Sequence, residues 1–131
     1  MAIVPKDLKY SREHEWVRQR DAVAMVGITD HAQRQLGDIV YVELPKVGDR
    51  FEAGEPFGSV ESVKAVTEVY APVTGEIIKV NEGVNDSPER LNEDPYGDGW
   101  MIEIRMANAT GATGLLTAAE YSDYIQEDAD S

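Results

Sequence analysis

Apolar and polar residues alternate along much of the first hundred positions, and this two-residue period is typical of half-buried β-strands. The segment 100–105 alternates almost without interruption, so one of its faces should be buried and the other wet. β-Branched and aromatic residues, which suit strands, recur in six further segments. These are 15–20, 22–26, 38–44, 56–60, 66–70 and 75–80. The pattern therefore predicts a mainly β protein.

Two short helical segments are expected between these strands. Asp30 and Gln33 have the spacing of a capping box, and Gly37 stands where a glycine often ends a helix. Ser87 and Pro88 are expected to start a second helical turn, with proline at its first position. Apart from that turn, the stretch 86–98 is interpreted as a polar surface connection.

A third helix is expected at the C-terminus, over about 117–127. Thr117 and Glu120 form a capping box at its start. Tyr121, Tyr124 and Ile125 follow at helical spacing and would form an apolar stripe along one face. This helix should pack against the body of the protein.

Length and charge narrow the class of protein. A chain of 131 residues and 14.5 kDa is most simply one domain, 1–131, with its β core over about 8–106. Its 25 acidic and 12 basic residues give a formal net charge of −13. Such a field repels nucleic acid and anionic membranes and favours basic surfaces on protein partners. We therefore expect neither nucleic acid nor membrane as a partner.

The chain contains no cysteine, so disulfides and thiolate metal sites are excluded. Its N-terminus lacks the apolar run of a signal peptide and the Arg- and Ser-rich character of an organellar presequence. We expect a cytoplasmic protein, or one of the mitochondrial matrix if a presequence has been removed. No long apolar helix face is present, which favours a monomer.

The segment 61–65 holds the residue of greatest chemical interest. If the strands 56–60 and 66–70 pair as a hairpin, Val63 and Lys64 lie at its tip. Lys64 has small or apolar neighbours and no adjacent opposite charge. A strand-end lysine is commonly just a solvated side chain, but an amine displayed in this way could also carry a prosthetic arm.

The two histidines give a poor basis for an enzyme. Strand alternation would place His14 on the opposite face from its two glutamate neighbours, packed or hydrogen-bonded beside Trp16. His31 is interpreted as a helix-surface residue. No metalloprotease spacing or nucleophile elbow accompanies either imidazole. We therefore expect no catalytic residues and no metal.

Several motifs together resemble a known family. The segments 47–55, 60–65 and 70–77 resemble the biotinyl/lipoyl-carrier fold, a flattened β-barrel/sandwich hybrid. Further segments narrow the resemblance to the H proteins of the glycine cleavage system: 13–17 (EHEWV), 26–33 (VGITDHAQ), 36–45 (LGDIVYVELP) and 94–100 (DPYGDGW). The similarity runs from about 8 to 124.

The resemblance implies a carrier with no catalysis of its own. In this family lipoic acid is joined by an amide to the motif lysine, here Lys64, by a lipoyl ligase or transferase. The P protein, a pyridoxal-phosphate decarboxylase, loads the aminomethyl group of glycine onto the arm. The T protein, an aminomethyltransferase, passes the carbon to tetrahydrofolate, and the L protein, dihydrolipoamide dehydrogenase, reoxidises the arm.

The resemblance also implies a cleft that shelters the loaded arm. The arm then carries a cationic amine, so carboxylates are the expected partners. By position, Glu15 is the first candidate, with Glu13 and Glu68 behind it, although all three could be ordinary solvated carboxylates. Glu61 is expected to serve recognition near the lysine.

Three alternatives stay open at this stage. The chain could be a lipoate-donating protein, another lipoyl or biotinyl carrier domain, or an unmodified interaction module of the same fold. Biotin carriers typically flank the lysine with methionines, whereas Val63 and Ala65 stand here. A lipoyl domain of a 2-oxoacid dehydrogenase usually belongs to a longer chain with linkers.

Overall fold

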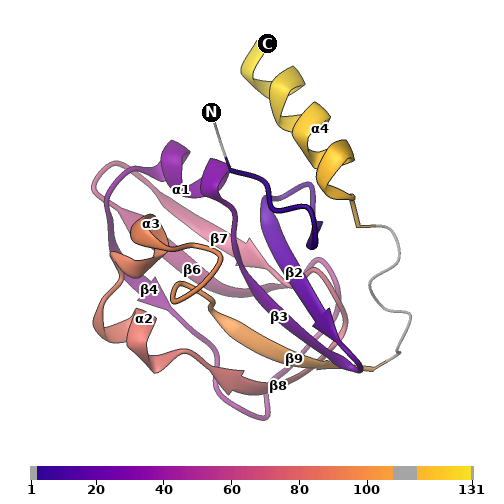
Figure 1. The fold of residues 1–131 in the computed structure, drawn as a ribbon. Coiled ribbons are helices and arrows are strands. Elements are labelled where there is room, and N and C mark those ends of the chain that lie inside the picture. The colour runs from indigo at the N-terminus through magenta and orange to yellow at the C-terminus, as the bar shows by residue number, and fades with distance from the viewer. Residues whose placement is uncertain (1–2, 108–114, 131) are drawn as a thin grey trace.

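A computed structural model describes residues 3–107 and 115–130 (Figure 1). In this part of the chain the strands, in order, are β1 (Lys9–Tyr10), β2 (Glu15–Arg20), β3 (Val23–Ile28), β4 (Ile39–Glu43), β5 (Arg50–Phe51), β6 (Pro56–Ser62), β7 (Val66–Tyr70), β8 (Gly75–Val80) and β9 (Ile102–Met106). The helices are α1 (Asp30–Leu36), α2 (Glu82–Asp86), α3 (Arg90–Glu93) and α4 (Ala118–Asp130).

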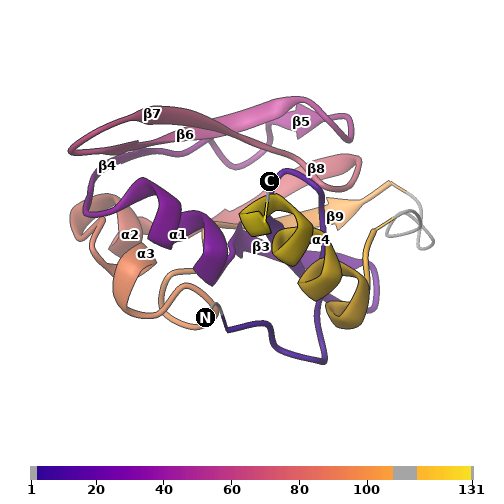
Figure 2. The same cartoon turned by 90° about the horizontal axis from the view of Figure 1, so that it is seen from above.

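The strands form two antiparallel sheets that lie as separate layers (Figure 2). The six-stranded sheet has the order β1-β2-β3-β9-β8-β5, and the three-stranded sheet has the order β4-β6-β7. In the described residues the sheets do not close into a barrel. The prediction of a mainly β, sandwich-like fold of the lipoyl-carrier type is therefore confirmed in its sandwich form.

The main core fills the space between the two sheets. Val26, Ile77, Ile102 and Ile104 of the six-stranded sheet and Val60 of the three-stranded sheet are fully buried in it. Ile102 and Ile104 are two residues apart in β9, and the residues between the buried positions are more exposed, which confirms the alternation predicted there. The strand itself begins at Ile102, two residues later than predicted.

A second, smaller core joins α4 to the edge of the six-stranded sheet. Trp16 and Val17 point to opposite faces of β2, so Val17 enters the main core and Trp16 the second one. The rings of Tyr10 and Tyr121 stack there, with their centroids 4.6 Å apart. Gly27, paired with Trp16, leaves room for the indole, since a Cβ at 27 would lie 2.7 Å from its Nε1.

The C-terminal helix begins as predicted. The backbone N–H of Thr117 donates to Glu120 Oε1 at 2.9 Å, and the N–H of Glu120 donates to Thr117 Oγ1 at 3.2 Å. Tyr121 and Ile125 are buried and Tyr124 is half-buried, so the predicted stripe is the packed face. The helix extends to Asp130, three residues beyond the predicted end.

The start of α1 differs from the prediction. Thr29, not Asp30, is the N-cap, and its hydroxyl accepts a hydrogen bond from the N–H of Ala32. Asp30 instead lies inside the first turn, where its carboxylate accepts from the backbone N–H of Ile3 and from Arg34, both at 2.8 Å. A threonine and an aspartate stand side by side here, and spacing alone did not identify the capping residue.

The region after β8 is more ordered and more buried than predicted. Asn81 caps α2, a helix that the sequence pattern did not reveal. The turn expected after Ser87 forms α3, but the stretch is not simply a polar surface connection, because Leu91 is fully buried. The predicted two or three helices are thus four among the described residues.

Candidate functional site

The β6–β7 hairpin displays Lys64 at its tip, as the sequence predicted. Strand β6 ends at Ser62 and β7 begins at Val66, so residues 63–65 form the connection. The buried Ser62 fixes this turn, because its N–H donates to Ala65 O at 2.8 Å while its hydroxyl accepts from the N–H groups of Lys64 and Ala65. The Lys64 side chain is exposed. A well-ordered turn thus presents a reachable amine.

The end of α1 lies beside this lysine. Gly37 closes the helix with φ of +78°, and its N–H donates to Gln33 O. A Cβ at residue 37 would lie 3.6 Å from Lys64 Cε, so the lysine stem passes over this glycine. The N–H of Val63 donates to Asp38 O at 3.1 Å and ties the tip to the same corner. The sequence correctly predicted Gly37 as the helix end.

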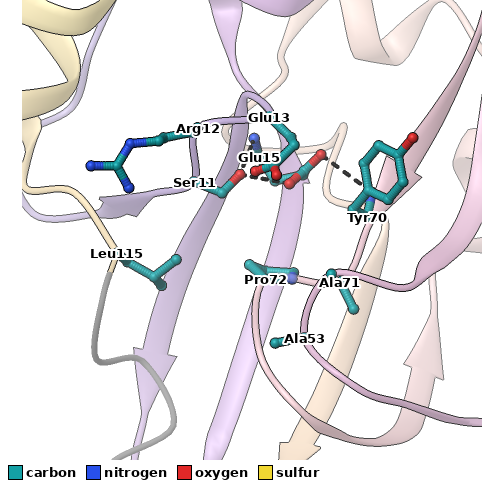
Figure 3. A pocket seen from close by; sticks show the side chains of 10 residues that line it. Ser11, Arg12, Glu13, Glu15, Ala53, Tyr70, Ala71, Pro72 and Leu115 are labelled. Carbon is teal, nitrogen blue, oxygen red and sulfur yellow. Dashed lines mark hydrogen bonds between the residues drawn. The ribbon is translucent and has the colours of Figure 1, made fainter.

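Glu15, the first of the predicted carboxylates, is buried rather than solvated. Only 2% of it is exposed. Ser11 Oγ donates to Glu15 Oε1 at 2.6 Å, and the backbone N–H of Tyr70 donates to Oε2 at 3.3 Å (Figure 3). The carboxylate therefore joins the loop before β2 to the far end of β7.

Burial also changes the acidity of this group. Removal from water raises the pKa of Glu15 from 4.5 to about 7, although the hydrogen bonds from Ser11 and from the Tyr70 N–H act in the opposite direction. The nearby charge of Glu13 raises the pKa further. Near neutral pH the side chain is thus poised between its neutral and charged forms, and a cation placed beside it would favour the charged form.

A cleft of about 130 Å³ brings the three predicted carboxylates together. Glu13 and Glu15 line it on one side, and Thr67 to Val69 of β7, including Glu68, line it on the other. Leu36 at the end of α1 also lines the cleft and immediately precedes the glycine under the Lys64 stem. The cleft therefore opens close to the displayed lysine.

The three carboxylates occupy different positions around this cleft. Glu15 is buried, whereas Glu13 and Glu68 are exposed. Strand pairing places Glu68 opposite Ser59, so its side chain is on the outer face of the sheet, away from the core. Glu61 is exposed on β6, near the hairpin tip but outside the set of residues that line the cleft.

A second cavity of about 180 Å³ also borders Glu15 (Figure 3). It shares Glu13 and Glu15 with the cleft and is bounded by Ala53, Pro72 and Leu115. Figure 3 shows the Arg12 side chain pointing away from Glu15. Glu15 is therefore one of the residues that line both cavities.

His14 lies in the loop before β2, with φ of +71°, so the strand alternation that was used to place it does not apply. The predicted hydrogen bond is present: Nδ1 lies 2.8 Å from the hydroxyl of Tyr121, which belongs to the second core together with Trp16. His14 is also one of the residues that line the cleft with Glu13 and Glu15.

His31 also differs from its interpretation as a helix-surface residue. It is half-buried, and its ring centroid lies 4.7 Å from that of His14. Tyr121 Oη lies 2.8 Å from Thr29 Oγ1 as well as from His14, so α4, the cap of α1 and the cleft share one hydrogen-bonded group. The described residues contain no cluster of three metal-ligating side chains.

Sequence reasoning missed Ser11 and Tyr121, the partners that hold Glu15 and His14 in place. Ser11 precedes Glu15 by four residues and gives no pattern signal, and Tyr121 lies 107 residues from His14.

None of the helices in the described residues combines the length and apolar character that a membrane span requires.

Comparison with known proteins agrees with this architecture. The family model described as glycine cleavage H-protein matches residues 8–128. The glycine cleavage system H protein of Herpetosiphon aurantiacus is 59% identical over 129 residues, covering 98% of both chains. That of Carboxydothermus hydrogenoformans is 52% identical over 128 residues, again covering 98% of both.

A solved structure of a protein with the same family name has a similar fold. The crystal structure of a glycine cleavage system H protein from Mycobacterium marinum superposes with a TM-score of 0.85 at 38% identity, covering 96% of this chain and 99% of that one. Matches over nearly the whole length do not favour the alternative carriers or the interaction module considered from the sequence.

Proposed function

Because this chain belongs to the glycine cleavage H-protein family, we propose that it carries lipoic acid on Lys64 and shuttles the aminomethyl group of glycine between enzymes. The single observation that supports this most strongly is the exposed Lys64 at a fixed hairpin tip, beside a cleft that contains a buried carboxylate. Residues 1–131 act as one carrier domain in this proposal.

The residues present fit the proposed group. An exposed primary amine can form an amide with the lipoyl carboxyl group, and the arm would then supply the dithiolane for reductive aminomethylation and reoxidation. The cleft volume of about 130 Å³ is below the roughly 300–1,000 Å³ of drug-sized pockets. It therefore suits a small aminomethyl head group.

Glu15 is proposed to hold that head group as its ionic partner. A buried carboxylate that faces a cation gains more Coulomb energy than a solvated one, because the local dielectric constant is lower. The Ser11 hydroxyl and the Tyr70 N–H orient the carboxylate. Glu13 and Glu68 at the rim would add negative potential, and the enclosed position would keep water from the adduct.

The proposed partners are the P protein that loads the arm, the T protein that unloads it, the L protein that reoxidises it, and a lipoyl ligase or transferase that attaches it. Glu61, exposed near the tip, is proposed to contribute to recognition by these proteins. The protein itself performs no catalysis in this scheme. The proposed compartment is the cytoplasm, which is consistent with the bacterial source of its relatives.

Reconstitution tests this proposal. The lipoylated protein is combined with P, T and L proteins, glycine, tetrahydrofolate and NAD, and NADH formation is followed. We expect glycine-dependent NADH formation only with the lipoylated form. An equal rate with the unmodified protein would show that this chain is not the carrier.

A further inference from the structure

The three-stranded sheet carries negative charge only. Strands β4, β6 and β7 contain the carboxylates of Glu43, Glu61 and Glu68 and neither lysine nor arginine. The strands of the six-stranded sheet contain six basic and three acidic residues. Lys64, in the connection between β6 and β7, is therefore the one cation at the tip of an otherwise acidic hairpin.

Strand register places an ordered row of side chains on the outer face of this sheet. Tyr41 of β4 pairs with Glu61 of β6, and Glu61 pairs with Val66 of β7. Directly paired residues of antiparallel strands point to the same face. Val42 and Val60, the next pair, are fully buried, so the Tyr41–Glu61–Val66 row faces outward.

The apolar members of this row are unusually exposed. Tyr41 is 51% exposed and Val66 is 67% exposed, and Val63 at the tip is 70% exposed. We call Tyr41, Glu61, Val63 and Val66 the tip patch. Exposed apolar side chains grouped with a polar residue are a common mark of a protein interface. Here the group surrounds the lysine that the proposed function modifies.

We propose that the tip patch is the docking surface for the enzyme that acylates Lys64, an inference that rests on the proposed function. That enzyme must bring its active site to the lysine nitrogen itself and must therefore cover the residues beside the tip. The enzymes that use the finished arm react at its distal sulfur atoms, away from the hairpin. The attaching enzyme is thus the partner whose contact the position of the patch requires.

The chemistry of the patch defines the complementary surface. Tyr41 and Val66 require apolar contacts, and the intervening Glu61 requires a basic side chain between them. Glu43 and Glu68 occupy the next outer row, on either side of Ser59, and extend the negative field. A partner surface with an apolar centre and a basic rim fits this arrangement.

The reaction at the docked lysine is an acyl transfer from an acyl adenylate. The neutral amine of Lys64 attacks the acyl carbon, the amide C–N bond forms and the nitrogen releases one proton. The acyl–phosphate bond breaks, and AMP leaves with the bonding electron pair. The patch provides no reacting group, so its residues affect binding and leave the chemical step unchanged.

The test uses the double variant Tyr41→Thr/Val66→Thr, which keeps β-branched residues in both strands. Val47→Thr is the matched control, because Val47 is 61% exposed but lies between β4 and β5, outside the patch. A lipoyl ligase, lipoate and ATP are supplied, and intact mass gives the initial rate of modification. We expect kcat/KM of the double variant to fall roughly tenfold, through KM, as for loss of interface anchors. The control should match the wild type.

A competition experiment separates docking from folding and from chemistry. The unmodifiable Lys64→Arg protein should inhibit lipoylation of the wild type, and adding Tyr41→Thr/Val66→Thr to it should weaken that inhibition roughly tenfold. Equal modification and equal inhibition with or without the patch substitutions would overturn this inference while leaving Lys64 as the attachment site. A wild-type protein that the ligase never modifies would overturn the proposed function and the inference together.

Discussion

The two sheets of this protein differ in size, charge and exposure. The six-stranded sheet contributes much of the main core, has α4 packed against one edge and carries twice as many basic as acidic residues in its strands. The strands of the three-stranded sheet carry only acidic charges, and three exposed apolar residues lie with Lys64 at one end of the sheet. The first sheet therefore serves chiefly as scaffold, and the second carries the lysine of the proposed site.

Glu15 connects these two functions. It belongs to β2 of the six-stranded sheet, yet it accepts a hydrogen bond from the backbone of Tyr70 in β7 of the other sheet. The cleft lies at this boundary between the sheets. If scaffold and site are separable, substitutions in each sheet should affect stability and carrier function independently, and Glu15 should affect both.

The largest expected effect is the loss of carrier function in Lys64→Arg. The guanidinium group stays protonated and is not an ordinary ligase substrate, although it preserves the charge. Because Lys64 is exposed, the free energy of unfolding should change by less than about 0.5 kcal/mol. Glycine-dependent NADH formation and urea denaturation measure the two quantities. Unimpaired glycine cleavage by this variant would remove Lys64 as the attachment site.

Ile104→Ala should lower the stability of the protein while leaving lipoylation of Lys64 intact, the reverse of the effect expected for Lys64→Arg. Ile104 lies in β9 and is fully buried in the main core, so the truncation should lower the free energy of unfolding by about 2–5 kcal/mol. At a temperature where the variant is still folded, circular dichroism should be native-like and Lys64 should be lipoylated at the wild-type rate. A folded Ile104→Ala protein that the ligase fails to modify would show that scaffold and site are not separable.

Glu15→Gln should alter both stability and function. Between pH 4.5 and about pH 7 the folded protein holds a proton on Glu15 more tightly than the unfolded chain does. Wild-type stability therefore falls as pH rises through this window, by up to about 3 kcal/mol for this group alone. Glutamine does not titrate, so the variant should gain stability relative to the wild type from pH 4.5 to pH 8. Urea denaturation at both pH values measures this difference. If the free energy of unfolding of the variant differed from that of the wild type by the same amount at pH 4.5 and at pH 8, Glu15 would not be a buried group with a raised pKa.

Glu15→Gln also tests whether Glu15 retains the aminomethyl adduct in the cleft. Lipoylation of Glu15→Gln should be normal, since the tip lies outside the cleft, but the aminomethyl adduct should be released faster. In the wild type, release should accelerate as pH falls and the carboxylate becomes protonated, at a pH below 7 because the bound amine favours the charged form of Glu15. In the variant this pH dependence should be absent. An unchanged release rate would exclude Glu15 as the ionic partner. Glu13→Gln, which removes an exposed charge of the same cleft, should accelerate release much less.

Thr117→Ala should give the smallest effect. Loss of the hydroxyl cap of α4 should cost about 1 kcal/mol of stability. The helix lies against the six-stranded sheet, away from the lysine tip, so acylation of Lys64 should proceed at the wild-type rate. Thermal unfolding and the ligase assay measure the two outcomes. A marked fall in lipoylation would mean that α4 affects the display of the lysine.

Local patterns in the sequence predicted the parts of this molecule that depend on near neighbours. Thr117 and Glu120 are three residues apart and form their capping box as expected, and the hairpin strands beside Lys64 are nearly contiguous. The ESVKA segment identified Lys64 from its immediate neighbours, whereas Glu15 in the EHEWV segment became a candidate only through the family resemblance. These features need only short-range geometry.

Other features depend on contacts between distant residues and could not be predicted in this way. His14 has a positive φ and lies outside β2, and its hydrogen-bond partner Tyr121 comes from the far end of the chain. Glu15 accepts a hydrogen bond from Tyr70, 55 residues away. No periodicity in the sequence encodes such pairs, so the pKa of Glu15 and the composition of the cleft became evident only from the fold.

The mass of the peptide containing Lys64, isolated from protein purified from its native cells, tests the central claim most directly. The account predicts a mass increase of one lipoyl group, located on the Lys64 side chain, in protein that supports glycine oxidation. Unmodified Lys64 in protein that is fully active in glycine cleavage would contradict it.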